Sequence, residues 1–292
     1  METAAQEKLK SLLASRKSAL TQYFDSAIYE VGFQGKNPLI IDAIEGFNQA
    51  WNSLGSGQEE KLQSLYIEKN PFEASKRHFY LNADDNSQYS FFHRQKHPLL
   101  SSLTNIDSYY DLFLINTQGD LIYSVDKEID FATNLKTGLW RETQLARLFE
   151  RINDSPKVGK VLISDYAPYK PSFDAPASFI GTAVYNQASQ YIGIVIFQLP
   201  IEPINRIMQV TAGMGTSGET YIVGEDLLMR SNSRFYKERS ILSTKVDTPS
   251  VHRALTGETG FAIIDDYRAI PVYSAFSPFN VLSINWAILA EI

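Results

Sequence analysis

The first part of the chain carries apolar residues at helical spacing. Within residues 1–32 they recur every three or four positions, and Leu9, Leu20 and Val31 belong to this series. Positions with this spacing share one face of a helix, so the pattern predicts one long amphipathic helix. A second helix is predicted from Pro38 onward, because proline suits the first turn of a helix.

The pattern weakens and then changes as the chain approaches its middle. Residues 57–70 are predicted to form a third, short helix. Residues 70–105 are polar and aromatic without a clean period, so we expect loops and short helices there. Two apolar runs then lie within 109–128 around a Gln-Gly-Asp turn, which is typical of two paired strands.

The residues that follow complete a mixed unit of helix and sheet. Residues 138–153 have apolar positions on one side of a predicted helix. Three further apolar stretches, 159–169, 175–186 and 191–201, read as strands. Two strands, one helix and three antiparallel strands predict an α+β unit around one central sheet.

The same order of elements returns in the last third of the chain. After a helix at 202–211, two strands are predicted within 218–233, then a short helix at 248–257 and three more strands. The short helix has Thr248 placed as its N-cap and Gly257 placed as its stop.

The repetition extends to individual residues. Asp165-Tyr166 has its counterpart in Asp266-Tyr267, and the run 193–201 corresponds to 285–292. A repeat of roughly 100 residues indicates two copies of one domain in tandem. We therefore predict three parts, listed in chain order: a helical segment at 1–70, a first sheet domain at 71–211 and a second at 212–292.

Three glycines raise a question about nucleotide binding. Gly213, Gly215 and Gly218 have the G-x-G-x-x-G spacing of a dinucleotide-binding loop. That loop works only where a strand ends and a helix begins, because the helix N-terminus holds the phosphate. Here a helix is predicted before the glycines and a strand after them. We therefore interpret the glycines as a connector between the two copies.

Composition narrows the classes of function. The chain has 292 residues, 44% of them hydrophobic, a net charge of −6 and no cysteine. Basic residues are scattered, so no nucleic-acid partner is expected. Without cysteine there is no thiolate nucleophile, disulfide or thiolate metal site. No run is long and apolar enough to span a bilayer, and we expect neither a cofactor nor a metal.

Several stretches together resemble the double Cache (dCache) sensor domains of bacterial transmembrane receptors. They are "YYDLFLINTQGDLIYSVDKEIDFATNL", "SDYAPYKPSFDAPASFI", "GIVIFQLPIEPINRIM" and "GTSGETYIVGEDLLMRSNSRF". The resemblance covers essentially the whole chain, and Gly215 to Arg234 is its most specific part. It implies an α+β fold with a long N-terminal helix and two tandem PAS-like domains, each a central antiparallel sheet flanked by helices.

The resemblance also implies a location and a role. We expect the periplasmic part of an inner-membrane receptor, excised with a vector-derived Met1 and flanked in the natural protein by two transmembrane helices. A small molecule would bind the membrane-distal copy and signal to a cytoplasmic histidine kinase, or else to a chemotaxis module or a cyclase. The fragment itself is expected to have no enzymatic activity, and its long helix is expected to support a homodimer.

The family's pocket lies between the sheet and the helix and loops that cross it. By resemblance, the residues facing a ligand would be Trp140, Arg141, Asp165, Tyr166, Tyr169, Ser172 and Asp174. A guanidinium grips a carboxylate, whereas a carboxylate and phenols accept the protons of an amine. The alternatives are a core role for Trp140, a solvated Arg141 and an Asp165 that satisfies a turn.

Two further observations qualify this site. Relatives that bind amino acids carry an arginine two residues before the tryptophan, where this chain has Gly138, which argues against an α-amino-acid ligand. In the second copy, Asp266, Tyr267 and Arg268 would line a smaller site, although that copy is usually empty in the family.

No catalytic arrangement emerges from the sequence. His93 and His97 are four residues apart, which suits a metal on one helix face, but a solvated loop or helix end is the favoured interpretation. A G-x-S-x-G nucleophile elbow is absent. The remaining alternatives are a module that binds a partner protein and, less favoured, a periplasmic hydrolase or solute-binding protein.

Overall fold

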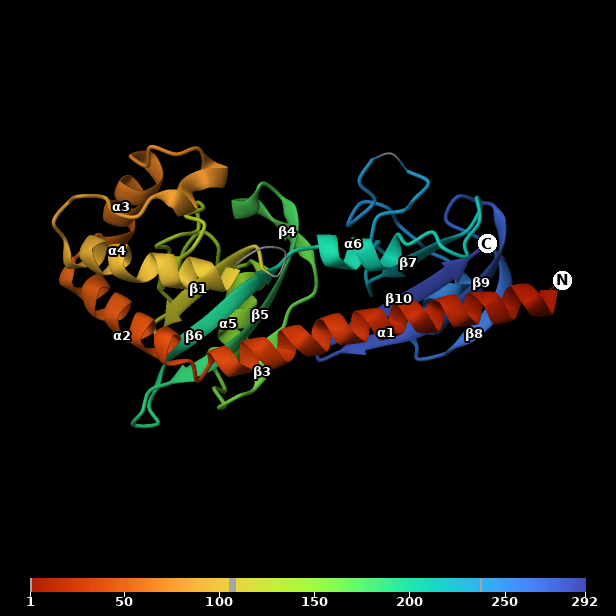
Figure 1. Cartoon of the computed structure of the whole chain (residues 1–292), viewed down its shortest axis with the longest axis horizontal. Coiled ribbons are helices and arrows are strands. Elements are labelled where there is room, and N and C mark those ends of the chain that lie inside the picture. The colour runs from red at the N-terminus through yellow and green to blue at the C-terminus, as the bar shows by residue number, and fades with distance from the viewer. Residues whose placement is uncertain (1, 105–108, 237) are drawn as a thin grey trace. The chain divides into compact units, whose positions relative to one another are not determined.

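The computed structural model describes residues 2–104, 109–236 and 238–292 (Figure 1). Contacts between residues divide the chain into two compact units, and each is described separately below. One unit consists of residues 28–200, and the other of residues 1–27 together with 201–292. The predicted limits at 70/71 and 211/212 follow the repeat instead of these contacts and stay predictions.

Unit 28–200 is a sheet with helices on both faces. Its described residues form a six-stranded antiparallel sheet in the order β2-β1-β6-β5-β3, with β4 paired to β5. The strands are β1 (Asp111–Asn116), β2 (Leu121–Ser124), β3 (Val161–Ile163), β4 (Ala167–Tyr169), β5 (Ala175–Tyr185) and β6 (Tyr191–Leu199).

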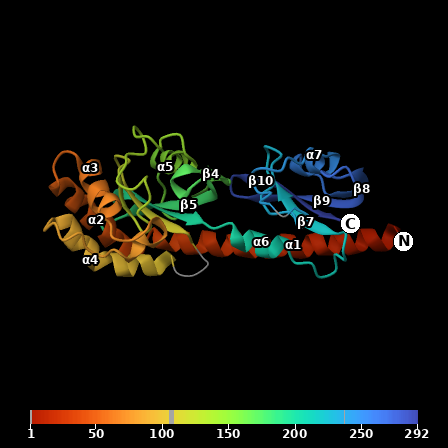
Figure 2. The ribbon, with the colours of Figure 1, turned by 90° about the horizontal axis from the view of Figure 1, so that it is seen from above.

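The helices of this unit include the end of the long helix α1 (Glu2–Gln34). The others are α2 (Pro38–Ser53), α3 (Gln58–Gln63), η1 (Ser64–Glu68), η2 (Ala74–Phe79), α4 (Gln88–Ser101), η3 (Ser102–Thr104), α5 (Gln144–Asn153) and η4 (Lys170–Ser172). Helices α2 and α4 lie side by side (Figure 2).

Local capping explains where these helices begin. Asn37 precedes α2, and its side chain accepts a hydrogen bond from the Leu39 N–H at 3.0 Å. Ser87 caps α4 in the same way, and Thr143 caps α5. Such side chains satisfy backbone donors that have no partner within the helix. Helix α5 therefore begins at Gln144, after Trp140 and Arg141 instead of at them.

Apolar residues on one face of the sheet pack against α5. Phe113 and Ile115 of β1 and Ile194 and Ile196 of β6 are buried there together with Phe149 of α5. These strand residues are two apart, as residues on one face of a sheet must be. The next residues of this series toward the edge are Asp111 and Gln198, which places two polar side chains on the apolar face.

Unit 1–27/201–292 repeats the same design on a smaller scale. Its described residues form a four-stranded antiparallel sheet in the order β7-β10-β9-β8. The elements are α6 (Glu202–Met208), β7 (Glu219–Val223), α7 (Pro249–Leu255), β8 (Gly260–Asp265), β9 (Pro271–Val281) and β10 (Ile284–Glu291). Val251 and Ala254 of α7 pack on the sheet beside Tyr221 and Leu289.

The α+β tandem predicted from the sequence is confirmed, with local differences. One strand predicted within 226–233 is reduced to isolated bridges, from Met229 to Val223 and from Leu228 to Lys245. Gly213 and Gly215 adopt positive φ between α6 and β7, as a connector requires, and no helix follows them. Residues 70–105 contain α4, a longer helix than expected.

The two histidines of α4 correct the expectation of a solvated loop or helix end. His93 and His97 are buried, and their rings stack with centroids 4.5 Å apart. His97 bonds the Tyr123 hydroxyl at 2.7 Å and the His78 carbonyl oxygen at 2.6 Å. Both rings belong to the aromatic core between α4 and the sheet.

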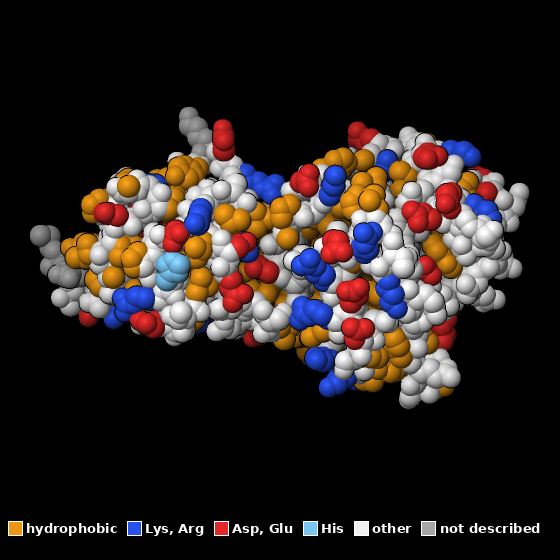
Figure 3. Space-filling model, turned by 180° about the vertical axis from the view of Figure 1, so that it is seen from behind, with side chains coloured by type: hydrophobic (Ala, Val, Ile, Leu, Met, Phe, Trp, Pro, Cys, Tyr) orange, Lys and Arg blue, Asp and Glu red, His pale blue; other side chains and the backbone are white. Residues whose placement is uncertain are grey.

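On the face seen from behind in Figure 3, basic and acidic side chains are interspersed. None of the helices in the described part of the chain combines the length and the apolar character that crossing a membrane requires.

Candidate functional site

A buried polar cluster lies at one end of the six-stranded sheet, on the face that α5 covers. Asp111 of β1 and Gln198 of β6 are cross-strand partners, and both side chains are buried. The loop after β2 adds Glu128 and Asp130, which are also buried. These four buried side chains lie near one another, since Glu128 and Asp130 both raise the pKa of Asp111 and Ser172 links Gln198 to Glu128.

The cluster is connected by hydrogen bonds to two residues predicted from the sequence. The Tyr169 hydroxyl donates to Asp130 Oδ2. The Ser172 hydroxyl donates to Glu128 Oε2 at 2.6 Å and lies 3.3 Å from Gln198 Nε2. Tyr110 donates to the other oxygen of Glu128 at 3.0 Å.

Asp111 ties the sheet to the loop that covers the cluster. Its Oδ1 accepts the backbone N–H groups of Leu112, Val125 and Asp126 at 2.6, 2.9 and 3.0 Å. A carboxylate oxygen at the start of a strand thereby fixes the chain where it leaves β2. The position of the loop and the position of Asp111 are coupled.

Three acceptors of the cluster lack a donor among the described residues. They are Asp111 Oδ2, Asp130 Oδ1 and Gln198 Oε1. The three side chains are at most 2% exposed. An acceptor removed from water without a hydrogen bond costs free energy, and buried polar groups are normally paired. Three such oxygens in one cluster therefore indicate a binding site.

Burial makes the carboxyl groups of the cluster weak acids. Burial together with neighbouring carboxylates raises the pKa of Glu128 to about 7, and burial raises that of Asp130 to about 6. The pKa of Asp111 is raised well above its usual range by burial and by Asp126. Such perturbed groups in one place are typical of functional sites.

The other predicted site residues lie outside this cluster. Trp140 is buried and donates from Nε1 to the Ile129 carbonyl at 3.2 Å, which holds the covering loop. Arg141 is exposed and bonds the Gly138 carbonyl oxygen. Asp165 accepts from the Tyr166 N–H, the turn role considered above.

Tyr166 and Asp174 complete the set of predicted residues. The Tyr166 hydroxyl donates to the Pro200 carbonyl at 3.0 Å, and Asp174 is exposed with a φ of 57°. A role in ligand binding stays a prediction for all seven residues. Tyr169 and Ser172 are the two that the structure joins to the buried acceptors.

Sequence reasoning missed Asp111, Glu128, Asp130 and Gln198. A signal for two of them exists, because Asp111 and Gln198 are polar residues within otherwise apolar strands. Glu128 and Asp130 belong to the run "DKEID", which looks like an ordinary solvated loop. Only the fold shows that this loop is closed over the sheet.

Two cavities accompany the cluster in the same unit. One of about 590 Å³ is lined by His78, His97, Tyr110, Val125 and Asp126 among others, and it adjoins the cluster through Tyr110 and Asp126. Ligand sites in proteins have volumes of roughly this size.

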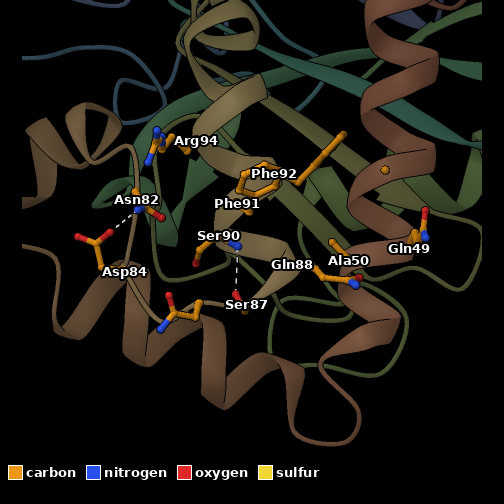
Figure 4. Close-up of a pocket in the computed structure, with 12 residues that line it drawn as sticks. Gln49, Ala50, Asn82, Asp84, Ser87, Gln88, Ser90, Phe91, Phe92 and Arg94 are labelled. Atoms are coloured by element: carbon orange, nitrogen blue, oxygen red, sulfur yellow. Dashed lines mark hydrogen bonds between the residues drawn. The ribbon is translucent and has the colours of Figure 1, made fainter.

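The second cavity, of about 650 Å³, lies between α2, α4 and the segment before α4 (Figure 4). Asp84 and Arg94 line it with several amides, and Phe92 packs against Gly46 on α2. Most of its polar groups are exposed and can be hydrated. Unlike the buried cluster, this cavity leaves no acceptor that requires a ligand.

Comparison with known proteins adds the following. No protein-family model matches the chain, and no curated protein sequence matches it. Among solved structures, the sensor domain of the Vibrio cholerae histidine kinase DctB is similar with a TM-score of 0.55 and 11% identity, over 96% of this chain and 94% of that one. The chain has the fold of a periplasmic sensor domain.

Two chemoreceptors support the same fold. The periplasmic sensory domain of Campylobacter jejuni Tlp1 matches with a TM-score of 0.50 and 13% identity, over 98% of this chain and 95% of that one. The ligand-binding domain of Pseudomonas fluorescens CtaA, in complex with L-serine, matches with a TM-score of 0.50 and 13% identity, over 100% and 96%. For another match, an extracellular ligand binding receptor from Desulfohalobium retbaense, the chain spans 39% of that protein's length.

These matches confirm the sensor-domain fold that the sequence resemblance implied. The long first helix and the two antiparallel sheets are shared features of the fold. At 11 to 13% identity the likeness concerns the fold alone. Individual site residues of this sensor-domain fold must therefore be argued from the chain itself.

Proposed function

We propose that the chain is the extracytoplasmic ligand-sensing domain of a transmembrane signalling receptor. It binds a small polar organic molecule at the buried cluster of unit 28–200. The observation that carries this proposal is the set of three buried oxygens without donors on Asp111, Asp130 and Gln198. The sensor-domain fold supports it, because that fold occurs in receptors of this kind.

The cluster offers a simple way to convert binding into movement. A ligand that bonds Asp130 and Gln198 at once would join the covering loop to the central strand β6. Asp111 already fixes the first residues of that loop through their N–H groups. A ligand that binds the closed arrangement better than an open one shifts the population toward closure.

The full protein would place this domain outside the cytoplasmic membrane, between two flanking transmembrane helices. We favour a histidine kinase as the cytoplasmic effector and a chemoreceptor as the alternative, since both kinds of receptor occur among the solved structures with this fold. The fragment itself would then have no catalytic role.

A thermal-shift screen tests the proposal. Purified protein is screened against organic acids, amino acids, amines, purines and sugars. A ligand at a hundred times its dissociation constant adds about 2.7 kcal/mol to the free energy of unfolding, which is a readable shift. Ser172→Ala should abolish the shift, because it removes a cluster hydroxyl. Asp154→Asn, a change at an exposed residue outside the predicted site, should leave it unchanged.

A binder whose shift survives Ser172→Ala, Glu128→Gln and Asp130→Asn would place the site elsewhere and overturn the assignment. The variant Arg141→Ala separates the structure-based site from the sequence-based one. Arg141 bonds the Gly138 carbonyl at the surface, so we expect its loss to leave binding intact.

We also propose that the receptor pairs through α1. Tyr29 and Phe33 on this helix are 81% and 61% exposed, which is unusual for large apolar side chains on a helix. Light scattering at high protein concentration should show a dimer that Tyr29→Ser with Phe33→Ser dissociates. A strictly monomeric mass for the unaltered protein would contradict pairing by the isolated domain.

A further inference from the structure

The internal repeat allows the buried cluster of the first copy to be compared with the equivalent residues of the second. Along both sheets, the first strand of each copy pairs with the last: β1 with β6, and β7 with β10. Asp111 faces Gln198 in the first copy, and Glu219 faces Glu291 in the second. Both pairs belong to the face that the helix of each copy covers. The two pairs occupy equivalent positions.

In the second copy the chain itself satisfies every oxygen of this pair. The two oxygens of Glu291 accept from the Tyr221 hydroxyl at 2.9 Å and from the Ser274 hydroxyl at 2.8 Å. Those of Glu219 accept from Tyr267 and, at 3.1 Å, from Ser233. A row of buried polar residues at this position of the sheet, here called the polar row of its copy, can thus have all its oxygens hydrogen-bonded within the protein.

In the first copy the equivalent row is short of donors. Asp111 Oδ2 and Gln198 Oε1 have none, and neither has Asp130 Oδ1 beside them. The hydroxyls of Tyr169, Tyr110 and Ser172 are already directed at Asp130 and Glu128. The difference between two copies of one design indicates that donors for the first copy come from a ligand.

The charges around the row are also unbalanced. Four acidic residues, Asp111, Asp126, Glu128 and Asp130, lie together, since each affects the pKa of another member. Three basic groups face these acids. The buried Lys127 bonds the Ser124 carbonyl and is attracted to Asp111 and Asp126, Arg77 bonds the Lys127 carbonyl and is attracted to Glu128, and His78 bonds Asp126. Burial lowers the pKa of Lys127 to about 7, so its ammonium offsets the four acidic groups only in part. Negative charge therefore prevails at the unpaired oxygens.

We infer that the ligand of this site is a small organic cation with N–H donors, a protonated primary amine, held by the unpaired oxygens of Asp111, Asp130 and Gln198. This inference rests on the function proposed above and names its ligand class. An ammonium group supplies up to three donors and the missing positive charge. A carboxylate ligand would instead meet like charge, and the nearest predicted guanidinium, Arg141, is at the surface.

The class of ligand predicts the direction of proton exchange. Glu128 and Asp130, with pKa values of about 7 and 6, are partly protonated near neutral pH. A bound cation favours their ionised forms, so binding releases protons and tightens as pH rises from 6 to 8. An anionic ligand would do the reverse, with proton uptake and weaker binding at higher pH.

The test is calorimetric titration of the wild-type domain at pH 6.5 in two buffers of different ionisation enthalpy. The compounds are putrescine, ethanolamine and agmatine as amines, choline as a cation without N–H donors, succinate as a carboxylate without an amine, and CaCl₂ as an inorganic cation. We expect an amine to bind with net proton release, and its affinity to rise at least threefold between pH 6 and pH 7.5. Ethanolamine should bind at least tenfold more tightly than choline.

Matched variants locate the effect. Asp130→Asn keeps the acceptor for Tyr169 but removes a charge, and we expect at least a tenfold loss of amine affinity. Glu219→Gln makes the same kind of change in the equivalent row of the second copy, where amine affinity should stay within twofold. Unfolding curves without ligand confirm that both variants are folded.

The remaining outcomes separate the two proposals. Binding of succinate alone, lost in Ser172→Ala, overturns the amine inference and keeps the proposed sensor function. If choline or Ca²⁺ binds as tightly as ethanolamine, N–H donors are not required and the inference is overturned. Failure of every compound, including a wider thermal-shift panel, counts against both the amine and the sensor site.

Discussion

Asp111 on β1 and Gln198 on β6 face each other across the sheet, and each retains a buried side-chain oxygen for which the described residues provide no donor. If these oxygens are left unpaired for a ligand, they lower the stability of the protein that has no ligand bound. Asp111→Asn should reduce this loss of stability, because the new amide N–H₂ is placed to donate where Oδ2 stood. Its remaining oxygen still accepts the N–H groups of Val125 and Asp126.

We expect Asp111→Asn to raise the free energy of unfolding by about 1 kcal/mol at pH 8, the scale of an unmade buried hydrogen bond. The gain should shrink as the pH falls to 5, because burial raises the pKa of Asp111 and favours its uncharged form. Urea unfolding at both pH values measures it. A variant that is less stable than wild type at pH 8 contradicts the unpaired state of Asp111.

Glu291 in the second copy gives a separate pH prediction. Burial raises its pKa from 4.5 to about 7. A carboxyl group with a raised pKa stabilises the folded state at low pH, and this contribution is lost as pH rises from about 4.5 through 7. Glu291→Gln, an uncharged mimic of the protonated form, should therefore gain about 1–3 kcal/mol over wild type at pH 8 and almost nothing at pH 4.5.

The control for Glu291→Gln is Glu258→Gln, a change at an exposed carboxylate that bonds Arg253. Exposed ion pairs contribute little, so its stability should differ from wild type by less than about 1 kcal/mol at either pH. Equal effects of Glu291→Gln at pH 4.5 and pH 8 would show that lost hydrogen bonds to Tyr221 and Ser274, and not ionisation, dominate.

Periodicity and repetition were sufficient to predict the fold. The apolar runs of β1 and β6, the helix that begins after Thr248 and the order of strands in both copies follow from local rules that the tertiary structure respects. One strand was predicted wrongly. The strand expected at 226–233 fails to extend because Met229 and Leu228 make only single bridges.

The site was less accessible from the sequence, because its members are polar residues whose burial depends on distant segments. Tyr169 and Ser172 were predicted and bond the cluster. Asp111 and Gln198 become partners only through β1–β6 pairing, across the 86 residues that lie between them. The loop residue Glu128 is buried only because Tyr110 and Ser172 reach it.

His97 provides a prediction about the core between α4 and the sheet. Its ring bonds the Tyr123 hydroxyl and the His78 carbonyl oxygen, and burial lowers its pKa to about 3. His97→Leu leaves both partners buried and unpaired, which should cost about 2–4 kcal/mol at pH 7. His252→Leu, at an exposed histidine, should cost less than about 1 kcal/mol.

The pH dependence of the His97 effect has a definite sign. In the unfolded chain His97 is protonated below about pH 6.5, whereas the folded protein keeps it neutral down to about pH 3. Its contribution to stability is therefore lost as pH falls through this window. The difference in stability between wild type and His97→Leu should narrow from pH 7 to pH 4, and a constant difference would show that His97 does not remain neutral.

The first helix should be an integral part of unit 1–27/201–292. Phe24 is fully buried, with its ring 5.9 Å from that of Phe279 and 5.8 Å from that of Trp286. Phe24→Ala removes these contacts and leaves a cavity, so we expect a loss of about 3–5 kcal/mol from this unit. Lys10→Ala, at an exposed position of the same helix, should change stability by less than about 0.5 kcal/mol.

Tryptophan fluorescence can assign that loss to the correct unit. The chain has three tryptophans, and replacing Trp51 and Trp140 by phenylalanine leaves Trp286 as the reporter. In this background, Phe24→Ala should lower the urea midpoint of the Trp286 signal. If the midpoint stays in place, α1 contributes nothing to the stability of the second sheet, and a signal carried by this helix would need another route into that unit.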